Sequence, residues 1–505
     1  MTRPEDDDAT SAAGEAEQDQ KDLHRGAAVN AVGLVFKAAT PVLFILMTRA
    51  YGEAAYGAFA AAQAIAIVVS KAATLGMDKA LLWWIPRQPE GQALRALTSA
   101  GTVAFLGNLV AALGLFALTF VDLSPWFAWP EAMRVQLRYL TVAMPFLALI
   151  EIFAHSAMGK RRMEAQVFIK DLFFPVCFLA LALAIWAVTQ NPAGCALGFV
   201  IASVVTTPVI YLVFRRFSRG DALGPIEKLP KEFRRYAGPM WLADTAASNL
   251  NQLDVFALTF LTGNMELVGI YKAASWIANQ LRSVRRAFDP ILLAIVSEIG
   301  AKKAYDRLGA GLTRATSLVM WVQIPAAFVV CVFADDLLLV FGEGFASGAT
   351  ALRILCVGWV VSCWLALSGV VISALGYARV ALVNTLLTSA LQLALLAVLV
   401  PAYSLNGAAI AAVGSLIGLG VVQAVEMRVI TGGFHYQRSL WKPAFFGTLA
   451  AAVGTLMVLW EVGGGWSKAV ATAAFVALYA PGAVRVVWPR ARPRSKSSDA
   501  PAEGS

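Results

Sequence analysis

Charged side chains are scarce in this chain, and their scarcity excludes a soluble globular domain. Only 14% of the 505 residues are Asp, Glu, Lys or Arg, 59% are hydrophobic, and the mean hydropathy is +0.67. Soluble domains carry roughly 25% charged residues. The formal net charge of +9 comes from short basic clusters between apolar segments, not from a stripe interleaved with aromatics. We therefore expect a polytopic all-α membrane protein and no nucleic acid partner.

Histidine and cysteine are also few, and their spacing argues against metal and disulfide chemistry. No two of the three histidines stand at ligand spacing, and the cysteines lie in or at the ends of apolar segments without a CxxC pair. We expect no metal centre and no cofactor, and cysteines that serve packing. The cysteines are Cys177, Cys195, Cys331, Cys356 and Cys363.

The first 25 residues lack the apolar core of a secretory leader. They are polar and acidic, which predicts a disordered cytoplasmic tail (1–25) and no cleaved signal peptide. The chain ends in a basic and then polar stretch (489–505), which predicts a second cytoplasmic tail.

Long apolar runs dominate the rest of the chain. A helix needs about 20 apolar residues to cross the bilayer, and fourteen segments meet this requirement. These segments are 28–48, 55–77, 97–120, 137–157, 167–189, 194–214, 236–261, 267–288, 311–333, 349–374, 380–400, 407–427, 443–461 and 469–488.

The basic residues predict the orientation of these segments. Most Lys and Arg fall in the loops that follow even-numbered segments, and only Arg49, Arg134, Arg138 and Lys468 fall on the other side. Because basic loops stay in the cytoplasm, both termini are predicted to be cytoplasmic.

Two glycine turns indicate an internal repeat. Gly57 in "YGEAAYGAFAAAQAI" and Gly269 in "LTGNMELVGIYKAASWI" are 212 residues apart, and Gly194 and Gly407 are 213 apart. The pattern predicts two pseudo-symmetric six-helix lobes in parallel orientation, followed by two further helices. The predicted parts are an N-lobe (28–214), a cytoplasmic linker (215–235), a C-lobe (236–427) and the last two helices (443–488).

Several motifs together carry a resemblance to a known family. The runs "TRAYGEAAYGAFAAAQ", "LGMDKALLWWIPR", "VGIYKAASWIANQ", "LLLVFGEGFASGATALRIL" and "LNGAAIAA" resemble the polysaccharide transporter branch, the Wzx-type flippases, of the multidrug/oligosaccharidyl-lipid/polysaccharide flippase superfamily. The resemblance covers about residues 25 to 488. It implies a fourteen-helix protein of the bacterial inner membrane that moves undecaprenyl-pyrophosphate-linked oligosaccharide outward, with membrane lipids and polysaccharide assembly proteins as partners.

Nine of the charged side chains in the predicted segments are candidates for a role inside the membrane. A charge at mid-bilayer costs about 2.5–3.5 kcal/mol, so such residues usually face a wet cavity or a partner. The surplus of basic groups suits a pyrophosphate, whose oxygens Arg binds with a fork of donors. The predicted substrate-binding residues are Lys37, Lys71, Lys272, Arg282, Arg285 and Arg286. The predicted ion-pairing or coupling residues are Glu151, Asp244 and Asp254.

Depths along regular helices predict which of these charges meet. At 1.5 Å per residue, Asp254 and Lys272 lie roughly 10 and 8 Å from the outer edge, and Asp244 lies at the depth of Arg282. The first pair is either functional or a structural link between its helices.

Other charges have a second interpretation. Lys71, Arg285 and Arg286 could instead be interfacial residues whose ends reach water. Glu151 and His155, at i and i+4, are either a proton-linked pair or a polar contact.

Other functions remain open on the sequence alone. A drug or cation antiporter, or a lipid II-type flippase, would share the fold, although a cation substrate favours an acidic cavity. A polymerase or ligase should have a large outward loop with catalytic groups, whereas the longest outward loop, 121–138, contains no histidine or nucleophile constellation. A scaffold would leave the buried charges unexplained.

Overall fold

The described part of the chain is helical throughout. The computed structural model describes residues 39–89, 94–218, 223–286, 308–374, 378–431, 441–460 and 466–487, and every regular element in these ranges is a helix. The predicted all-α fold is therefore confirmed.

The helices of the first half follow the predicted segments closely. They are α2 (Ala39–Ala73), α3 (Met77–Trp84), the 3₁₀ turn η1 (Ile85–Arg87), α4 (Arg95–Leu118), α5 (Glu131–Gly159), the π-helix η2 (Ala165–Phe173), α6 (Phe174–Thr189) and α7 (Gly194–Phe217).

The helices of the second half do the same. They are α8 (Lys231–Leu250), α9 (Leu253–Ala257), the π-helix η3 (Leu258–Thr262), α10 (Met265–Arg286), α12 (Leu308–Val332), α13 (Ala334–Leu339), the 3₁₀ turn η5 (Glu343–Gly348), α14 (Ala349–Ala374), α15 (Ala378–Thr431), α16 (Trp441–Leu459) and α17 (Ser467–Val487).

Two of these helices each contain a pair of predicted segments joined at a sharp kink. The kink in α2 lies at Gly52, whose φ of 74° only glycine adopts without strain. The kink in α15 lies at Ser404, with a φ of 48°. Both kinks fall between two predicted segments, so the predicted turns are present although the helices are continuous on either side.

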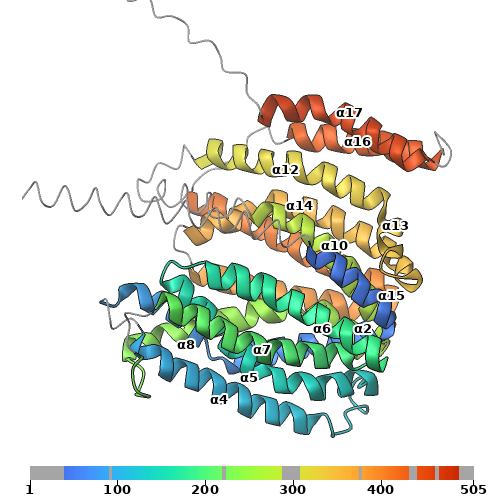
Figure 1. Ribbon diagram of the computed structural model, residues 1–505. Coiled ribbons are helices and arrows are strands. Elements are labelled where there is room, and N and C mark those ends of the chain that lie inside the picture. The colour runs from blue at the N-terminus through green and yellow to red at the C-terminus, as the bar shows by residue number, and fades with distance from the viewer. Residues whose placement is uncertain are drawn as a thin grey trace, which may run out of the picture. The chain divides into compact units, whose positions relative to one another are not determined.

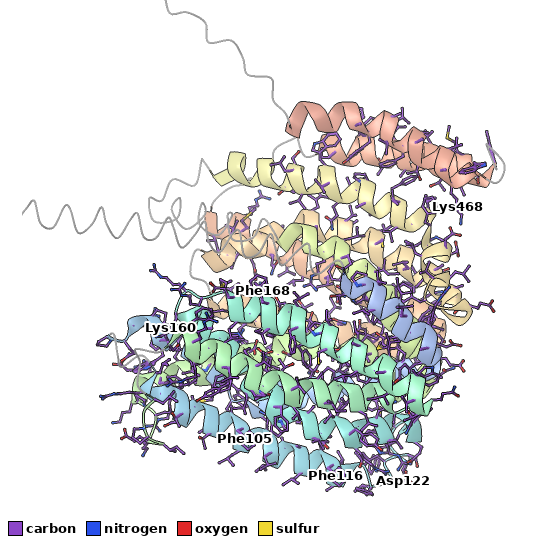
Figure 2. All side chains as sticks on the ribbon, in the orientation of Figure 1. Phe105, Phe116, Asp122, Lys160, Phe168 and Lys468 are labelled. Carbon is purple, nitrogen blue, oxygen red and sulfur yellow. The ribbon has the colours of Figure 1, made fainter. Side chains whose placement is uncertain are left out.

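Seven described helices are long and apolar enough to cross a membrane, namely α2, α4, α5, η2 with α6, α7, η5 with α14, and α15. Helix α4 exposes Val110 at 70% and Leu113 at 62%, which suits a lipid-facing surface. Figure 2 places Phe105 and Phe116 along α4, between Lys160 at one end of the helices and Asp122 at the other. The chain is a multi-pass membrane protein.

The helices form two compact units. Unit 1 comprises residues 1–278, 334–355 and 378–419, and α4, α5, α6 and α7 run side by side within it (Figure 1). Unit 2 comprises residues 279–333, 356–377 and 420–505, and within it α16 and α17 pack together and against α12. The division into an N-lobe, a C-lobe, a linker and two tails stays a prediction.

The core of unit 1 contains many small side chains. Ala80, Ala100, Ala104 and Ala154 are fully buried within a cluster formed by α3, α4, α5, α7 and α8. Small residues let helix backbones approach closely where no water drives their association. This close packing brings the polar groups of neighbouring helices within reach of one another.

Candidate functional site

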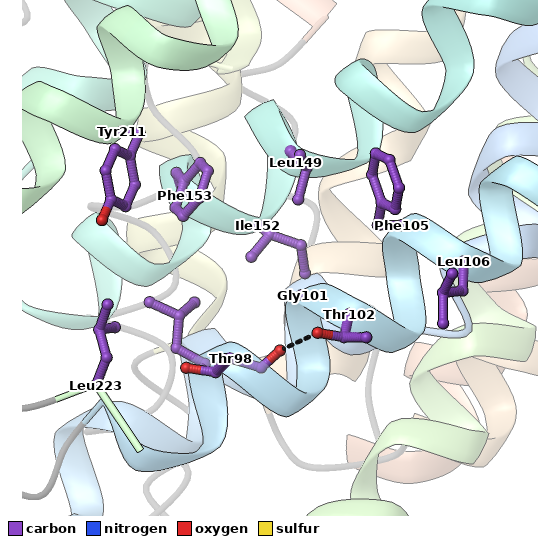
Figure 3. A pocket seen from close by; sticks show the side chains of 11 residues that line it. Thr98, Gly101, Thr102, Phe105, Leu106, Leu149, Ile152, Phe153, Tyr211 and Leu223 are labelled. Carbon is purple, nitrogen blue, oxygen red and sulfur yellow. Dashed lines mark hydrogen bonds between the residues drawn. The ribbon is translucent and has the colours of Figure 1, made fainter. Parts of the chain in front are cut away.

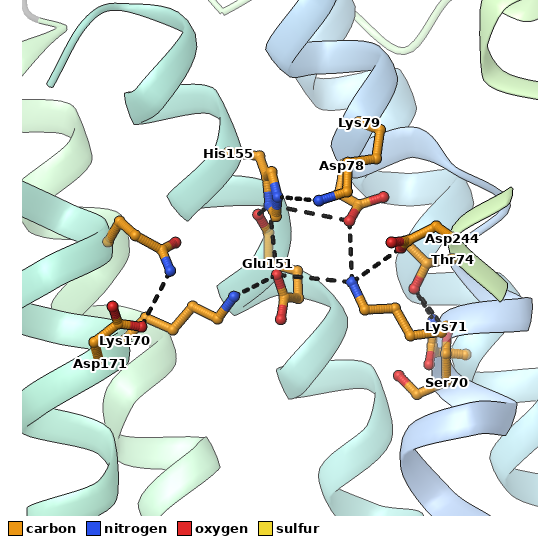
Figure 4. A network of polar contacts seen from close by, with 12 residues as sticks. Ser70, Lys71, Thr74, Asp78, Lys79, Glu151, His155, Lys170, Asp171 and Asp244 are labelled. Atoms are coloured by element: carbon orange, nitrogen blue, oxygen red, sulfur yellow. Dashed lines mark hydrogen bonds and ion pairs between the residues drawn. The ribbon is translucent and has the colours of Figure 1, made fainter. Parts of the chain in front are cut away.

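Three carboxylates from three helices of unit 1 surround the ammonium group of Lys71, which lies on a fourth helix (Figure 4). Lys71 lies in the last turn of α2, and its Nζ is 3.2 Å from Asp78 Oδ2 on α3 and 3.3 Å from Asp244 Oδ2 on α8. Glu151 Oε2 on α5 is 3.9 Å away. The Asp78 side chain is only 1% exposed, whereas that of Asp244 is 25% exposed.

Asp78 reaches Lys71 because the helix breaks between them. In a continuous helix, residues seven apart are roughly 10 Å apart along the axis. Here Leu75 and Gly76 adopt φ values of 54° and 69°, and α3 begins anew at Met77. The break turns the carboxylate back towards the end of α2.

Helix α8 docks against this break and brings in the third carboxylate. Trp241 Nε1 donates a hydrogen bond to the carbonyl oxygen of Ala72 at 2.7 Å. A Cβ added at Gly76 would lie 2.7 Å from the carbonyl oxygen of Ala237, so this approach requires a glycine. Asp244 follows Trp241 by three residues and therefore lies on the same helix face.

His155 joins the cluster through both ring nitrogens. Its Nδ1 is 2.9 Å from the carbonyl oxygen of Glu151, and its Nε2 is 2.9 Å from Lys79 Nζ. An ammonium donates to Nε2 only if that nitrogen carries a lone pair, so these partners fit a neutral imidazole with its proton on Nδ1. The Glu151 carboxylate is 3.4 Å from Nδ1.

A second lysine holds Glu151 from a π-helix. Lys170 Nζ donates to Glu151 Oε2 at 2.8 Å, and one turn of η2 is also braced by Gln166, which donates to Asp171 Oδ1 at 3.1 Å. The wider turn of a π-helix rotates the residues that follow it, and such turns are frequent at functional sites.

The charges of this cluster balance when the imidazole is neutral. Three ammonium groups face three carboxylates, so each buried charge has a partner, as burial among apolar helices requires. Burial alone would raise the pKa of Asp78, but Lys71 and the other basic groups around it together outweigh burial and hold this pKa below its ordinary value. The members of the network are Lys71, Lys79, Lys170, Asp78, Glu151, Asp244 and His155.

Three residues of the network carry side chains that commonly bind metal ions. One ligand atom each from Asp78, Glu151 and His155 lies within 4.8 Å of the others. However, the Lys71 ammonium stands 3.2 Å from the Asp78 carboxylate, where a cation would have to bind. The arrangement is that of an ammonium held by carboxylates, and the absence of a metal centre stays a prediction.

Asp254 and Lys272 each form a hydrogen bond with another residue, and their predicted ion pair stays a prediction. Tyr271 OH donates to Asp254 Oδ2 at 2.6 Å, and Lys272 Nζ donates to Gln252 Oε1 at 3.0 Å. The depth calculation assumed one regular helix, whereas the chain breaks at Asn251 and continues as the short α9 and the π-helix η3.

Asp244 has an ion-pair partner within unit 1, and its predicted pairing with Arg282 stays a prediction. Asp244 pairs with Lys71, and the Arg282 guanidinium lies 4.6 Å from the centre of the Trp359 ring in unit 2. Equal depth does not determine which way a side chain points around the helix axis. Lys37 lies outside the described residues, as do the side chains of Arg285 and Arg286 in the last turn of α10.

Sequence reasoning missed three members of the network. Asp78 and Lys79 fall just beyond the predicted segment 55–77, and Lys170 lies within segment 167–189 but is not among the predicted binding or pairing residues. One sequence feature could have indicated Asp78. It follows the intramembrane Lys71 by seven residues, and the Leu75-Gly76 pair between them can break the helix. The partners of Lys79 and Lys170 come from α5, which the local sequence does not reveal.

Unit 1 also has an apolar groove away from these charges. It has a volume of about 420 Å³ and lies between α4, α5 and α7 (Figure 3). Within it Thr102 Oγ1 donates to the carbonyl oxygen of Thr98 at 2.8 Å. Its lining contains no acid, lysine or arginine, so the charge chemistry of unit 1 lies elsewhere. The lining residues are Leu97, Thr98, Gly101, Thr102, Phe105, Leu106, Leu149, Ile152, Phe153, Tyr211 and Leu223.

Comparison with known families identifies the group to which the chain belongs. A family model described as "Polysaccharide biosynthesis protein" matches residues 23–287, which is more than half of the chain. The chain belongs to this family. A comparison of this polysaccharide biosynthesis family member with curated proteins found no match.

Solved structures show which fold this family member has. It is similar to the lipid II flippase MurJ in an inward closed conformation, with 11% identity, a TM-score of 0.71 and coverage of 90% of this chain and 98% of that chain. It is similar to an inward-facing multidrug resistance MATE family transporter of the MOP superfamily, with 15% identity, a TM-score of 0.63 and coverage of 81% and 99%. A MOP superfamily transporter from Pyrococcus furiosus matches with 14% identity, a TM-score of 0.58 and coverage of 83% and 97%. The family member therefore has the MOP fold, in agreement with the resemblance noted in its sequence.

Proposed function

We propose that this protein is a flippase for undecaprenyl-pyrophosphate-linked oligosaccharide in the bacterial inner membrane, with both termini in the cytoplasm. The observation that carries the proposal is the match of residues 23–287 to a polysaccharide biosynthesis family. A fold shared with a protein described as a lipid II flippase adds support. The substrate moves from the cytoplasmic to the periplasmic leaflet.

The contacts of the basic residues suggest a division of roles. Lys71 is bound by three carboxylates, so its charge is already compensated and it suits a coupling role with Glu151 and Asp244. Lys272 donates a hydrogen bond to the neutral Gln252 and interacts electrostatically with one acid, Asp254, whereas three carboxylates surround Lys71. Lys272 is therefore the stronger candidate for a pyrophosphate contact.

Other residues predicted from the sequence keep their roles within this proposal. Arg282, with Lys37, Arg285 and Arg286, remains a candidate contact for the pyrophosphate. Asp254, which binds Tyr271 OH, orients the segment that precedes α10. Polysaccharide assembly proteins remain proposed partners.

Contacts of α8 support transport by alternating access. The Lys71–Asp244 ion pair and the Trp241–Ala72 hydrogen bond join α8 to the end of α2. In the predicted topology this is the cytoplasmic end, because the basic loop at 160–162 follows α5 there. Opening towards the cytoplasm would separate Asp244 from Lys71, while Asp78 and Glu151 continue to hold the lysine.

A reconstituted flipping assay tests the proposed function. Proteoliposomes would contain the full chain and a fluorescent polyprenyl-pyrophosphate oligosaccharide, and a membrane-impermeant quencher would measure the fraction that crosses the bilayer. We expect the protein to accelerate crossing, and Lys272→Met to slow it at least about tenfold, whereas the exposed Arg216→Met should retain the native rate.

Two outcomes would count against this proposal. Crossing no faster than in protein-free vesicles would remove the flippase function. Accumulation of a cationic dye driven by a proton or sodium gradient, without lipid crossing, would establish an antiporter instead.

A further inference from the structure

Two glycines bring the backbones of α2 and α10 into direct contact. A Cβ added at Gly57 would lie 1.7 Å from the carbonyl oxygen of Met265 and 2.7 Å from the amide nitrogen of Gly269. A Cβ added at Gly269 would lie 2.1 Å from the carbonyl oxygen of Glu53 and 3.1 Å from the amide nitrogen of Gly57. Any side chain at either position would therefore force the two backbones apart.

The contact is reciprocal, and its two sides are related by the sequence repeat. Gly57 approaches Met265, and Gly269 approaches Glu53. Residues 53 and 265 are 212 apart, as are residues 57 and 269. Because equivalent residues of the two segments exchange places across the contact, the segments are related there by a local two-fold axis. The offset of 212 residues that the sequence turns indicate therefore also relates the two sides of this contact.

The contact lies on the side of unit 1 away from the Lys71 network. Ala128, in the loop after α4, donates its N–H to the carbonyl oxygen of Phe260 at 3.1 Å, next to the Gly263 turn that leads into α10. This loop is the predicted outward loop. Lys71 follows Gly57 by 14 residues, or roughly 21 Å along α2.

We propose that the Gly57–Gly269 contact is the outer seal of the transport pathway and separates when the protein opens outward. This inference rests on the proposed transport function. Each glycine is followed four residues later by a buried alanine, Ala61 or Ala273, a small-xxx-small pattern that allows close helix packing. The atoms nearest to an added Cβ at either glycine belong to the backbone of the facing helix.

The seal separates Lys272 from the outer side. Lys272 follows Gly269 by three residues on α10, so it lies on the same face and roughly 4.5 Å further in. Opening the seal exposes this ammonium, and the anion it holds, to the outer side. The symmetric contact thus controls release of the substrate headgroup.

Thiol labelling in right-side-out vesicles tests the seal. Lys272→Cys would be labelled from outside by a membrane-impermeant maleimide, in the native background and together with Gly57→Ala or Gly269→Ala. We expect either alanine to raise the labelling rate at least about fivefold, because the added Cβ disfavours the closed state. Gly114→Ala is the matched control, because no atom lies within 4 Å of its added Cβ.

Labelling needs no substrate, so it is independent of the identity of the glycan. Faster labelling, together with no flipping by the native chain that retains Lys272, would support the seal and count against the proposed substrate. An unchanged labelling rate in Gly57→Ala and Gly269→Ala at normal membrane abundance would overturn the seal.

A cross-link keeps the proposal testable if the glycine variants do not accumulate. Glu53→Cys with Met265→Cys leaves both glycines in place and can be bridged by a short, reducible bis-thiosulfonate reagent. We expect bridging to lower flipping at least about tenfold and reduction to restore it, while Glu53→Cys alone is unaffected by the reagent. Full flipping by the bridged protein would show that the contact does not open during transport.

Discussion

At the scale of single residues, the network around Lys71 shows how charges are held among apolar helices. Asp78 is almost completely buried and also lies 4.0 Å from His155, whereas Asp244 is a quarter exposed and has Lys71 as its ion-pair partner. Losing one member of a buried pair leaves a charge without compensation, which costs far more than losing a member of an exposed pair. The two carboxylates therefore differ in what they contribute to stability.

The first prediction concerns these two carboxylates. Asp78→Asn should destabilise the protein by about 3 kcal/mol, and Asp244→Asn by about 1 kcal/mol or less. The unfolding temperature of the detergent-solubilised protein measures the difference, with Lys71→Arg as a variant that keeps the charge. Equal losses of stability in Asp78→Asn and Asp244→Asn would show that burial does not determine how much each carboxylate contributes to stability.

The second prediction concerns Asp254 and Lys272. Because Tyr271 binds one and Gln252 binds the other, exchanging the charges through Asp254→Lys and Lys272→Asp should not restore activity lost in the single variants. Tyr271→Phe should instead reproduce part of the Asp254→Asn defect, since each removes the same hydrogen bond. The flipping rate measures both effects, and recovery in the double exchange would establish a direct pair.

At the scale of secondary structure, breaks between helices position the polar groups. The break at Leu75 and Gly76 turns Asp78 towards Lys71, and the break at Asn251 redirects Asp254 towards Tyr271. A regular helix would place these groups along its axis at fixed rotations. The irregular turns therefore decide which charges meet.

The third prediction concerns the first of these breaks. Gly76→Ala should lower stability by several kcal/mol, because the glycine has a φ of 69° and its added Cβ would lie 2.7 Å from the Ala237 carbonyl oxygen. Gly114→Ala should be neutral or slightly stabilising, as alanine is the better helix former. Thermal unfolding in detergent compares them. A tolerated Gly76→Ala would mean that α8 does not dock closely on this turn.

At the scale of the whole molecule, the two predicted repeats share a backbone contact but differ in chemistry. Gly57 and Gly269 are equivalent, yet the residue 212 positions after Lys71 is Ser283, and the residue 213 positions after Glu151 is Trp364. Most members of the charged network thus lie in the first predicted repeat, with Asp244 from the second, and the counterparts of Lys71 and Glu151 are uncharged. Such asymmetry suits a transporter in which one half carries most of the coupling groups and both halves contribute the gates.

The fourth prediction concerns glycan display by cells that depend on this protein. Arg282→Ala should abolish the surface glycan at normal membrane abundance, and Arg282→Lys should retain part of it, because lysine keeps the charge but loses the fork of donors. Arg353→Ala is the control, since Arg353 and Asp335 form an exposed pair. Full display with Arg282→Ala would show that the stacking of Arg282 on Trp359 is only structural.

How much the sequence predicted depends on the range of the interaction involved. Hydropathy placed segments such as 97–120 and 349–374 within two residues of α4 and α14. Lipid offers no hydrogen bonds, so an apolar segment in the bilayer must pair its own backbone N–H and C=O groups by forming a helix. Composition and motif order identified the family, and the offset of 212 pointed to Gly57 and Gly269, whose mutual contact the structure then showed.

The partners of the buried charges were decided only by the tertiary structure. Sequence gives the depth of Asp244 along its helix, but the choice of Lys71 as its partner depends on the rotation of α8 and on its docking against the Gly76 turn. Likewise, Lys170 meets Glu151 only because the π-helix η2 packs on α5. Periodicity determines which residues share one helix face, whereas contacts between helices depend on the packing of side chains far apart in the chain.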